Sequence, residues 1–185
     1  MASVLVPLAQ GCEELEAVTV IDLLRRAGIR VVTAGLDDQP VRASRGVVLI
    51  PDTTLGDALA EEFDMIVLPG GQPGATHLGQ DERVTGLLQQ MARAGKYTAA
   101  ICAAPGVLAQ CGLLEGRRAT GFPGTLVPGD VPGLDYVNDP VVTDGKVITS
   151  RGPGTAMDFA LQLIELLAGA GKRREVEAGL QRTAH

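Results

Sequence analysis

The chain has 185 residues and a formal net charge of −6 at pH 7. Apolar residues make up 45% of the sequence and aromatic residues 3%, which predicts one compact domain over residues 1–185 with an aliphatic core. The acidic balance argues against a nucleic-acid partner, and the chain shows neither a signal peptide nor an apolar stretch of membrane-spanning length, so we expect a cytoplasmic protein.

The chain begins with an apolar segment, residues 3–7, that predicts a short buried strand closed by Pro7. A helix is predicted over residues 12–27, because apolar residues recur at helical spacing and Gly28 stands at the usual C-terminal position. Its apolar stripe consists of Ala17, Val20, Ile21 and Leu24.

Three glutamates fall near the start of this helix. At 100° per residue, Glu13 lies along the centre of the apolar stripe, Glu16 on one flank and Glu14 on the other. Glu13 and Glu16 are therefore candidates for partly buried carboxylates, whose raised pKa suits proton transfer. The alternative is that acids in a first helical turn only complement the helix dipole.

The next segments predict a strand over 30–35, a small hairpin excursion over 41–50 with Arg45 at its turn, and a short helix over 54–60. Thr53 or Thr54 caps that helix.

Residues 65–68 form a four-residue apolar strand that runs directly into Pro69, Gly70 and Gly71. Glycines at the carboxyl end of a strand permit close backbone approach to a ligand, and the Gly71 N–H is a candidate oxyanion donor. A plain turn is the alternative, since Pro-Gly pairs mark turns very often.

A helix over 82–94 ends at Gly95, and a strand from residue 97 then stops at Cys102 and turns into a helix over 103–110. A cysteine at such a turn lies near unpaired N–H groups of the helix, which favour the reactive thiolate. The alternative is an inert buried cysteine.

The C-terminal third predicts a short strand over 118–121 and a hairpin of 141–143 with 147–150 around an Asp-Gly turn. A helix over 155–167 follows, and residues 172–184 form a polar helix or fraying tail.

Alternating strands and helices predict a mainly parallel sheet covered on both faces. Ligands of such sheets bind beyond the carboxyl ends of the strands, where Glu13, Glu16, Gly70, Gly71 and Cys102 all fall. Their convergence favours a catalytic role for Cys102 over an inert one.

Six segments in chain order resemble the ThiJ/PfpI superfamily, in particular its glyoxalase III and protein deglycase branch, which includes the human parkinsonism-associated deglycase and bacterial homologues. These segments are Gly11-Cys-Glu-Glu-Leu-Glu-Ala17, Arg25-Arg-Ala-Gly28, Ser44-Arg-Gly-Val47, Val67-Leu-Pro-Gly-Gly71, Ala99-Ala-Ile-Cys-Ala-Ala-Pro105 and Thr149-Ser-Arg-Gly-Pro-Gly-Thr155.

The resemblance implies a flavodoxin-like three-layer sandwich, usually a homodimer, with Cys102 as nucleophile and Glu16 as the acid that bonds its sulfur and shuttles protons. It implies that the Gly71 and Ala103 amides form the oxyanion site. The other residues that it places around the pocket are Glu13, Arg45, Gly70 and Pro153.

Enzymes of this branch convert methylglyoxal or glyoxal to hydroxyacids without a cofactor and are reported to reverse early glycation of amines and thiols. The competing interpretation is an oxidation-sensing stress protein or chaperone that uses the same cysteine with little turnover, because a reactive thiol beside a carboxylic acid also stabilises a sulfinate.

The chain lacks the histidines that some members of the superfamily carry near the cysteine. Human-type members carry a histidine where this chain has Phe122, and the protease and amidotransferase relatives place one directly after the cysteine, where this chain has Ala103. The histidines are His77 and the terminal His185. Neither these nor the three cysteines show metal-ligand spacing, so we expect no metal. Three cysteines cannot all pair within the chain, which favours a reducing compartment.

Overall fold

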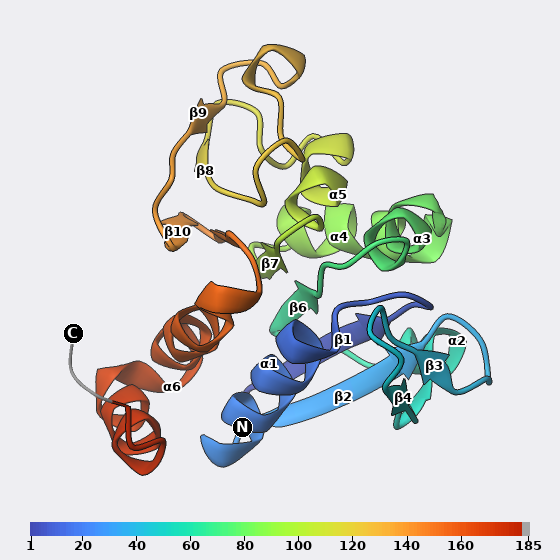
Figure 1. The fold of residues 1–185 in the computed structure, drawn as a ribbon, viewed down its shortest axis with the longest axis vertical. Coiled ribbons are helices and arrows are strands. Elements are labelled where there is room, and N and C mark those ends of the chain that lie inside the picture. The colour runs from blue at the N-terminus through green and yellow to red at the C-terminus, as the bar shows by residue number, and fades with distance from the viewer. Residues whose placement is uncertain (183–185) are drawn as a thin grey trace.

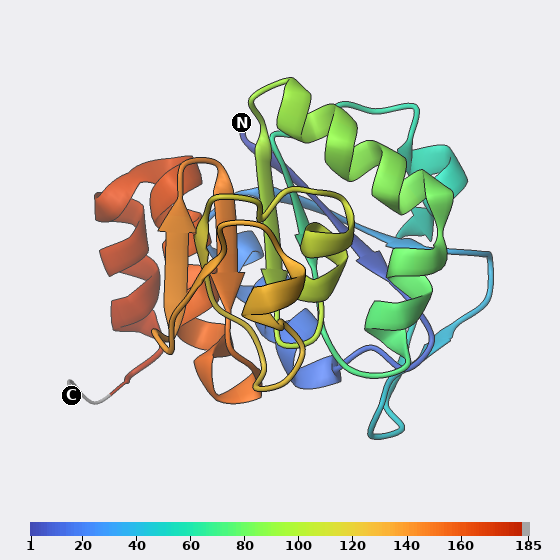
Figure 2. The same cartoon turned by 90° about the horizontal axis from the view of Figure 1, so that it is seen from above.

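The computed structural model describes residues 1–182. A seven-stranded sheet forms its centre, in the order β10-β11-β7-β6-β1-β2-β5 (Figures 1 and 2). Neighbouring strands are parallel except for the antiparallel pair of β10 and β11. The strands of this sheet are β1 (Ser3–Leu8), β2 (Arg30–Gly35), β5 (Thr53–Thr54), β6 (Met65–Leu68), β7 (Tyr97–Ile101), β10 (Val141–Asp144) and β11 (Val147–Ser150).

Helices cover both faces of the sheet, which confirms the predicted α/β fold with a mainly parallel sheet. On one face α1 (Glu14–Arg26) packs beside α6 (Ala156–Gly179) (Figure 1). The other face carries α2 (Leu55–Ala58), α3 (Gly74–Gln80), α4 (Glu82–Arg93) and α5 (Pro105–Gln110).

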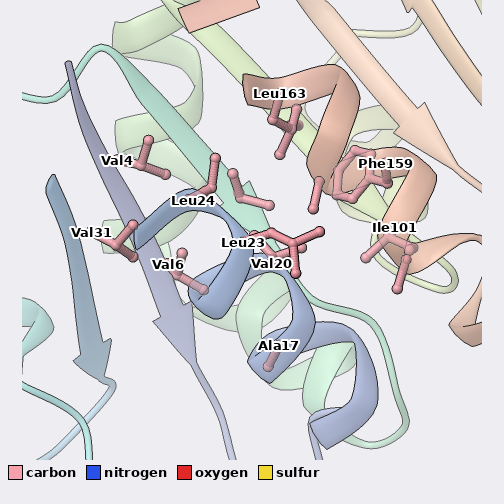
Figure 3. Close-up of a cluster of buried hydrophobic side chains, with 14 of the residues drawn as sticks. Val4, Val6, Ala17, Val20, Leu23, Leu24, Val31, Ile101, Phe159 and Leu163 are labelled. Atoms are coloured by element: carbon pink, nitrogen blue, oxygen red, sulfur yellow. The ribbon is translucent and has the colours of Figure 1, made fainter. Parts of the chain in front are cut away.

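Two cores follow from the alternation of side chains along the strands. In β1, Val4 and Val6 enter the core beneath α1 and α6, whereas Leu5 enters the core on the opposite face. Figure 3 shows the first core, where Leu23 of α1 and Phe159 of α6 meet side chains of the sheet. Fully burying one such side chain stabilises the fold by about 1.5–3 kcal/mol.

Two small sheets lie outside the central one. The predicted excursion over 41–50 is confirmed as an antiparallel hairpin, with β3 (Val41–Arg42) and β4 (Val48–Leu49) shorter than expected. β8 (Arg118–Ala119) pairs in parallel with β9 (Asp135–Tyr136). Two 3-10 turns, η1 (Pro128–Asp130) and η2 (Pro153–Thr155), complete the described elements.

Some predicted boundaries are wrong. The first helix begins at Glu14 rather than Cys12, the helix after Cys102 begins at Pro105, and the helix of residues 54–60 ends at Ala58. Helix α3 is missing from the prediction, because a glycine-containing segment gives no clear helical stripe.

The last helix, α6, continues to Gly179 and breaks at Gly169, whose φ is +87°. Beyond the break the chain folds back, so that Arg182 lies 2.8 Å from Asp158 and Arg173 pairs with Glu165. The predicted polar segment is therefore helical as far as Gly179, while its residues 183–184 and His185 lie outside the described residues.

Candidate active site

Cys102 stands where β7 ends, in a left-handed backbone conformation with φ of +64°. This conformation is strained for a residue with a side chain and persists only when neighbours hold it. Its N–H donates to the Ser150 carbonyl at 3.0 Å. Its carbonyl accepts hydrogen bonds from the Phe122 N–H at 2.8 Å and from Thr125 Oγ1 at 3.3 Å. Two segments distant in sequence, around residues 122–125 and at Ser150, thus fix the turn that presents the sulfur.

Glu16, on α1, reaches the same place and is fully buried. Its Oε2 accepts a hydrogen bond from the Gly70 N–H at 2.8 Å. A Cβ on Gly70 would lie 2.5 Å from Cys102 Cβ and 2.7 Å from Glu16 Oε2. Glycine at position 70 therefore lets the carboxyl group and the cysteine approach each other across the end of β6.

Burial raises the pKa of the Glu16 carboxyl from 4.5 to about 7. The Gly70 N–H and a hydrogen bond with the Cys102 side chain oppose this rise in pKa without cancelling it. Glu16 Oε1 is buried and accepts no hydrogen bond from residues 1–182, which further disfavours the charged form. The carboxyl group can therefore hold a proton near neutral pH.

The Cys102 thiol has its pKa raised to about 12, mainly by burial and next by the charge of Glu16. Hydrogen bonds from the Gly71 and Ala103 N–H groups lower the pKa. These N–H groups favour the thiolate, as the sequence predicts, but burial and the ionised carboxylate outweigh them. A proton on Glu16 removes the charge that opposes thiolate formation.

The raised pKa of Glu16 makes a prediction for stability. The folded chain binds more protons than the unfolded chain between about pH 4.5 and pH 7, so the free energy of unfolding should fall as pH rises through this window. Relative to Glu16→Gln, the loss in the wild type should reach about 3 kcal/mol by pH 8. Urea unfolding of both proteins from pH 4.5 to 8 measures it. If the free energy of unfolding changed equally with pH in both proteins, the pKa of Glu16 would not be raised.

The acids at the start of α1 have different roles from those that the helical spacing predicted. Glu13 is the N-cap residue of α1, but its side chain makes no capping hydrogen bond; its N–H donates to the Gly70 carbonyl at 2.9 Å, and its carboxylate accepts from Ser44 Oγ at 2.9 Å. Glu14, expected on the flank away from Glu16, is buried, and its carboxylate accepts the Arg45 N–H at 3.0 Å. These bonds lower the pKa of Glu14 despite the opposing effect of burial.

Sequence reasoning missed Glu14, because the turn that buries it lies some thirty residues further along the chain. The only local signal was the run of acids itself. Glu14 holds the hairpin turn next to α1 and thereby fixes the position of Arg45, whose side chain is exposed.

Pro153 starts the turn η2, close to the strand end that holds Cys102. Thr155 Oγ1 of this turn lies 2.7 Å from Ser150 Oγ, and the Ser150 carbonyl accepts the Cys102 N–H. The structure therefore gathers Cys102, Glu16, Gly70, Gly71 and Ala103 in direct contact, with Glu13, Arg45 and Pro153 on segments bonded to them.

Cys12 lies close to the acids at the start of α1, whereas Cys111 is the C-cap residue of α5 and the described histidine lies on α3. Cys12 is fully buried, burial raises its pKa to about 11, and it belongs to the core beneath α1. Burial also raises the pKa of Cys111. His77 Nδ1 lies 3.0 Å from the Gln10 carbonyl. Within residues 1–182 no three metal-ligating side chains cluster together.

None of the helices that the structure describes is long and apolar enough to cross a membrane.

Comparison with known proteins places these features in context. A model of the DJ-1/PfpI family matches residues 2–166. Protein dj-1beta of Drosophila melanogaster is 47% identical over 180 residues, which cover 96% of each chain. The glutathione-independent glyoxalase DJR-1.2 of Caenorhabditis elegans is 36% identical over 92% of this chain and 90% of its own. The crystal structure of Drosophila melanogaster DJ-1beta superimposes with a TM-score of 0.93 at 45% identity, covering 99% of both chains.

Proposed function

Because this chain belongs to the DJ-1/PfpI family, we propose that it is a cysteine-dependent glyoxalase that converts methylglyoxal or glyoxal to hydroxyacids without a cofactor. We extend the proposal to reversal of early glycation, as part of cytoplasmic defence against carbonyl and oxidative stress. A relative named as a glyoxalase supports the reaction class.

One observation carries the proposal. A cysteine in a strained turn lies against a buried carboxyl group whose pKa is raised to about 7, and two N–H groups point at its sulfur. A group with a pKa near the working pH transfers protons most effectively in both directions. The N–H groups of Gly71 and Ala103 can stabilise negative charge on the sulfur or on an oxygen bonded next to it.

The first step is addition of the Cys102 sulfur to the aldehyde carbon of methylglyoxal. Glu16 takes the thiol proton, a C–S bond forms, and the aldehyde oxygen becomes an oxyanion held by backbone N–H groups. Returning the proton to that oxygen gives a hemithioacetal and leaves Glu16 as a carboxylate.

The second step moves hydrogen from the aldehyde carbon to the ketone carbon. Glu16 removes the proton from the former to give an enediol and delivers a proton to the latter, which leaves a lactoyl thioester on Cys102. Water then cleaves the C–S bond and releases lactate and the thiol. The aldehyde is oxidised and the ketone reduced within one molecule, so no external oxidant is required.

Turnover in deuterium oxide tests this route. Methylglyoxal should yield lactate that carries deuterium at C2, with repeated turnovers per protein, as followed by NMR. Buffers without Tris or free thiols are needed, because both scavenge the aldehyde. Consumption of aldehyde without lactate would reject the glyoxalase.

The competing role is an oxidation sensor with little turnover. It is favoured by a cysteine residue that is 9% exposed beside an acid able to donate to a sulfinate oxygen. Absence of lactate, together with oxidation by hydrogen peroxide confined to Cys102 in peptide mass spectrometry, would select this role.

A homodimer is part of the proposal. Exposed apolar side chains lie together on α1 and on the neighbouring hairpin, which Glu14 joins to the helix. Contiguous exposed apolar surface of this kind marks interfaces. The side chains are Leu15, Val18, Val47, Val48 and Ile50.

Val18→Glu should weaken self-association at least about a hundredfold, because a twofold interface would receive the unpaired charge twice. Val18 is 45% exposed, so the fold should tolerate the change. Leu59→Glu, at a site 40% exposed after α2, is the matched control. Sedimentation equilibrium measures both, and equal dissociation constants would place the interface elsewhere.

A further inference from the structure

A cavity of about 320 Å³ lies at the carboxyl edge of the central sheet, apart from the cysteine. Residues at the ends of β1 and β2 form one side of it, and α3 forms the other. Neither Cys102 nor Glu16 lines this space, so the reaction proposed above does not use it. Because ligands of such sheets bind beyond the carboxyl ends of the strands, the cavity stands where a second ligand is expected.

The walls of the cavity are held together before any ligand arrives. The turn after β1 packs so closely on the start of α3 that a Cβ on Gly74 would lie 2.5 Å from the Cys12 nitrogen. Gln10, in the same turn, donates from Nε2 to the Pro40 carbonyl and accepts the Arg42 N–H at Oε1, both at 2.9 Å. These contacts join the strand end, the helix and the following loop, as expected of a pre-formed site.

Charge in the cavity comes from Asp37 and Asp81. Asp81 is paired, because its oxygens accept from Arg83 Nε at 3.0 Å and from a terminal Arg83 nitrogen at 2.6 Å. The same guanidinium donates to the Leu36 carbonyl at 2.8 Å. It also feels the charge of Asp37, but within residues 1–182 no basic side chain lies within 4 Å of the Asp37 carboxylate. One negative charge of the lining is therefore uncompensated.

The polar side chains of α3 add hydrogen-bond acceptors. His77 and Gln80 both line the cavity and are three residues apart, so they share a face of the helix. His77 Nδ1 lies 3.0 Å from the Gln10 carbonyl. Because a carbonyl oxygen only accepts, Nδ1 carries the hydrogen, and Nε2 of the neutral ring is an acceptor. With the Gln80 amide oxygen and the Asp37 carboxylate, the lining offers three acceptors.

The rest of the lining is apolar. Leu8, Ala9 and Val41 are buried, and Leu36 is partly buried. An ammonium group has three N–H donors and one positive charge, which match the three acceptors and the uncompensated carboxylate. The apolar side chains suit a hydrocarbon body next to that group. The cavity lies near the lower end of the roughly 300–1,000 Å³ range of ligand sites, so the ligand is small.

We propose that this cavity binds small primary amines in their protonated form, with the ammonium group held by Asp37, His77 and Gln80 and an apolar body against β1 and β2. The site is separate from the cysteine, and the inference does not depend on the proposed function.

A series of probes of similar shape and different charge tests the proposal. 2-Phenylethylamine, 2-phenylethanol and 3-phenylpropanoate are titrated into the wild-type protein and followed by the backbone amide NMR signals of Leu36, His77 and Gln80. We expect saturable shifts with the amine and a dissociation constant at least about tenfold lower than that of the alcohol, because hydrogen bonds to a charged group are the stronger ones. The carboxylate should bind more weakly than both. Equal affinities for amine and alcohol, or no saturable shifts, would overturn the inference.

A pair of matched variants separates the site from general attraction to an acidic surface. Asp37→Asn removes the uncompensated charge but keeps the oxygen that accepts the Gln39 N–H at 2.9 Å, so the fold should tolerate it. It should weaken binding of the amine at least about tenfold and leave binding of the alcohol unchanged. Asp38→Asn makes the same change of charge one residue further on, outside the lining, and should bind the amine as the wild type does. Equal losses in both variants would overturn the inference.

Cys102→Ser then shows whether the two sites are independent. It should bind 2-phenylethylamine with the dissociation constant of the wild type, because the cysteine does not line the cavity. Weaker binding in this variant would place the amine at the cysteine and overturn the inference. A wild type that makes no lactate from methylglyoxal would reject the proposed function, while the titrations still decide whether the cavity binds amines.

Discussion

Cys102→Ser should lower kcat for lactate formation from methylglyoxal by at least about 10³-fold, because a hydroxyl group in this environment cannot supply a comparable nucleophile. Glu16→Gln should lower it by about 10²–10⁴-fold, since the amide still accepts the Gly70 N–H but cannot carry a proton between substrate carbons. Initial rates of lactate release from both variants measure these losses.

The matched control is Cys111→Ser, which alters a half-buried cysteine outside the pair. It should keep wild-type turnover and unfold at a similar urea concentration. Activity that survives in Cys102→Ser would remove the proposed nucleophile. If activity were lost in Cys102→Ser but retained in Glu16→Gln, water or another side chain would have to carry the proton instead of Glu16.

Gly70→Ala should cost about 2–4 kcal/mol of folding stability and most of the activity. The added methyl group would lie 2.5 Å from Cys102 Cβ and 2.7 Å from the Ile101 carbonyl, so the cysteine and the carboxyl group would have to separate. Urea unfolding and methylglyoxal turnover measure the two effects.

Gly86→Ala provides the opposite case at a site within α4, where a Cβ meets no atom within 4 Å. The same substitution there should stabilise the protein by about 0.5–1 kcal/mol, because alanine favours the helix and glycine does not. If Gly70→Ala behaved like Gly86→Ala, the close packing of Cys102 against Glu16 would not be required.

Much of the fold is predictable because the strands are apolar runs with clear ends. Residues 65–68 run into a Pro-Gly-Gly turn, and the 141–150 hairpin has an Asp-Gly turn, so both were located correctly. The helix α3 was missed because its stability comes from Ala75 and Leu78 packing into a distant core rather than from helix propensity.

In the candidate site, too, local sequence patterns predict some features, while others depend on contacts with segments distant in sequence. The sequence predicts Glu16 near the cysteine because both residues follow the ends of strands. The carboxyl ends of parallel strands meet at one edge of the sheet. Helical spacing favours Glu13 over Glu14 as a buried acid, whereas Glu14 is the more buried of the two, because its burial depends on the hairpin turn at Arg45. The N–H groups near Cys102 lower its pKa as predicted, but the net pKa is raised by the burial and the negative neighbour that folding supplies.

The backbone bonds of Cys102 also determine when reactivity arises during synthesis. Its turn needs the carbonyl of Ser150 and the donors at Phe122 and Thr125, all of which leave the ribosome after it. A nascent chain that lacks those segments cannot form these hydrogen bonds, so its Cys102 keeps the freedom of a flexible coil. The turn that presents Cys102 is complete only once β11 has joined the sheet, so the proposed activity requires completed assembly of the chain.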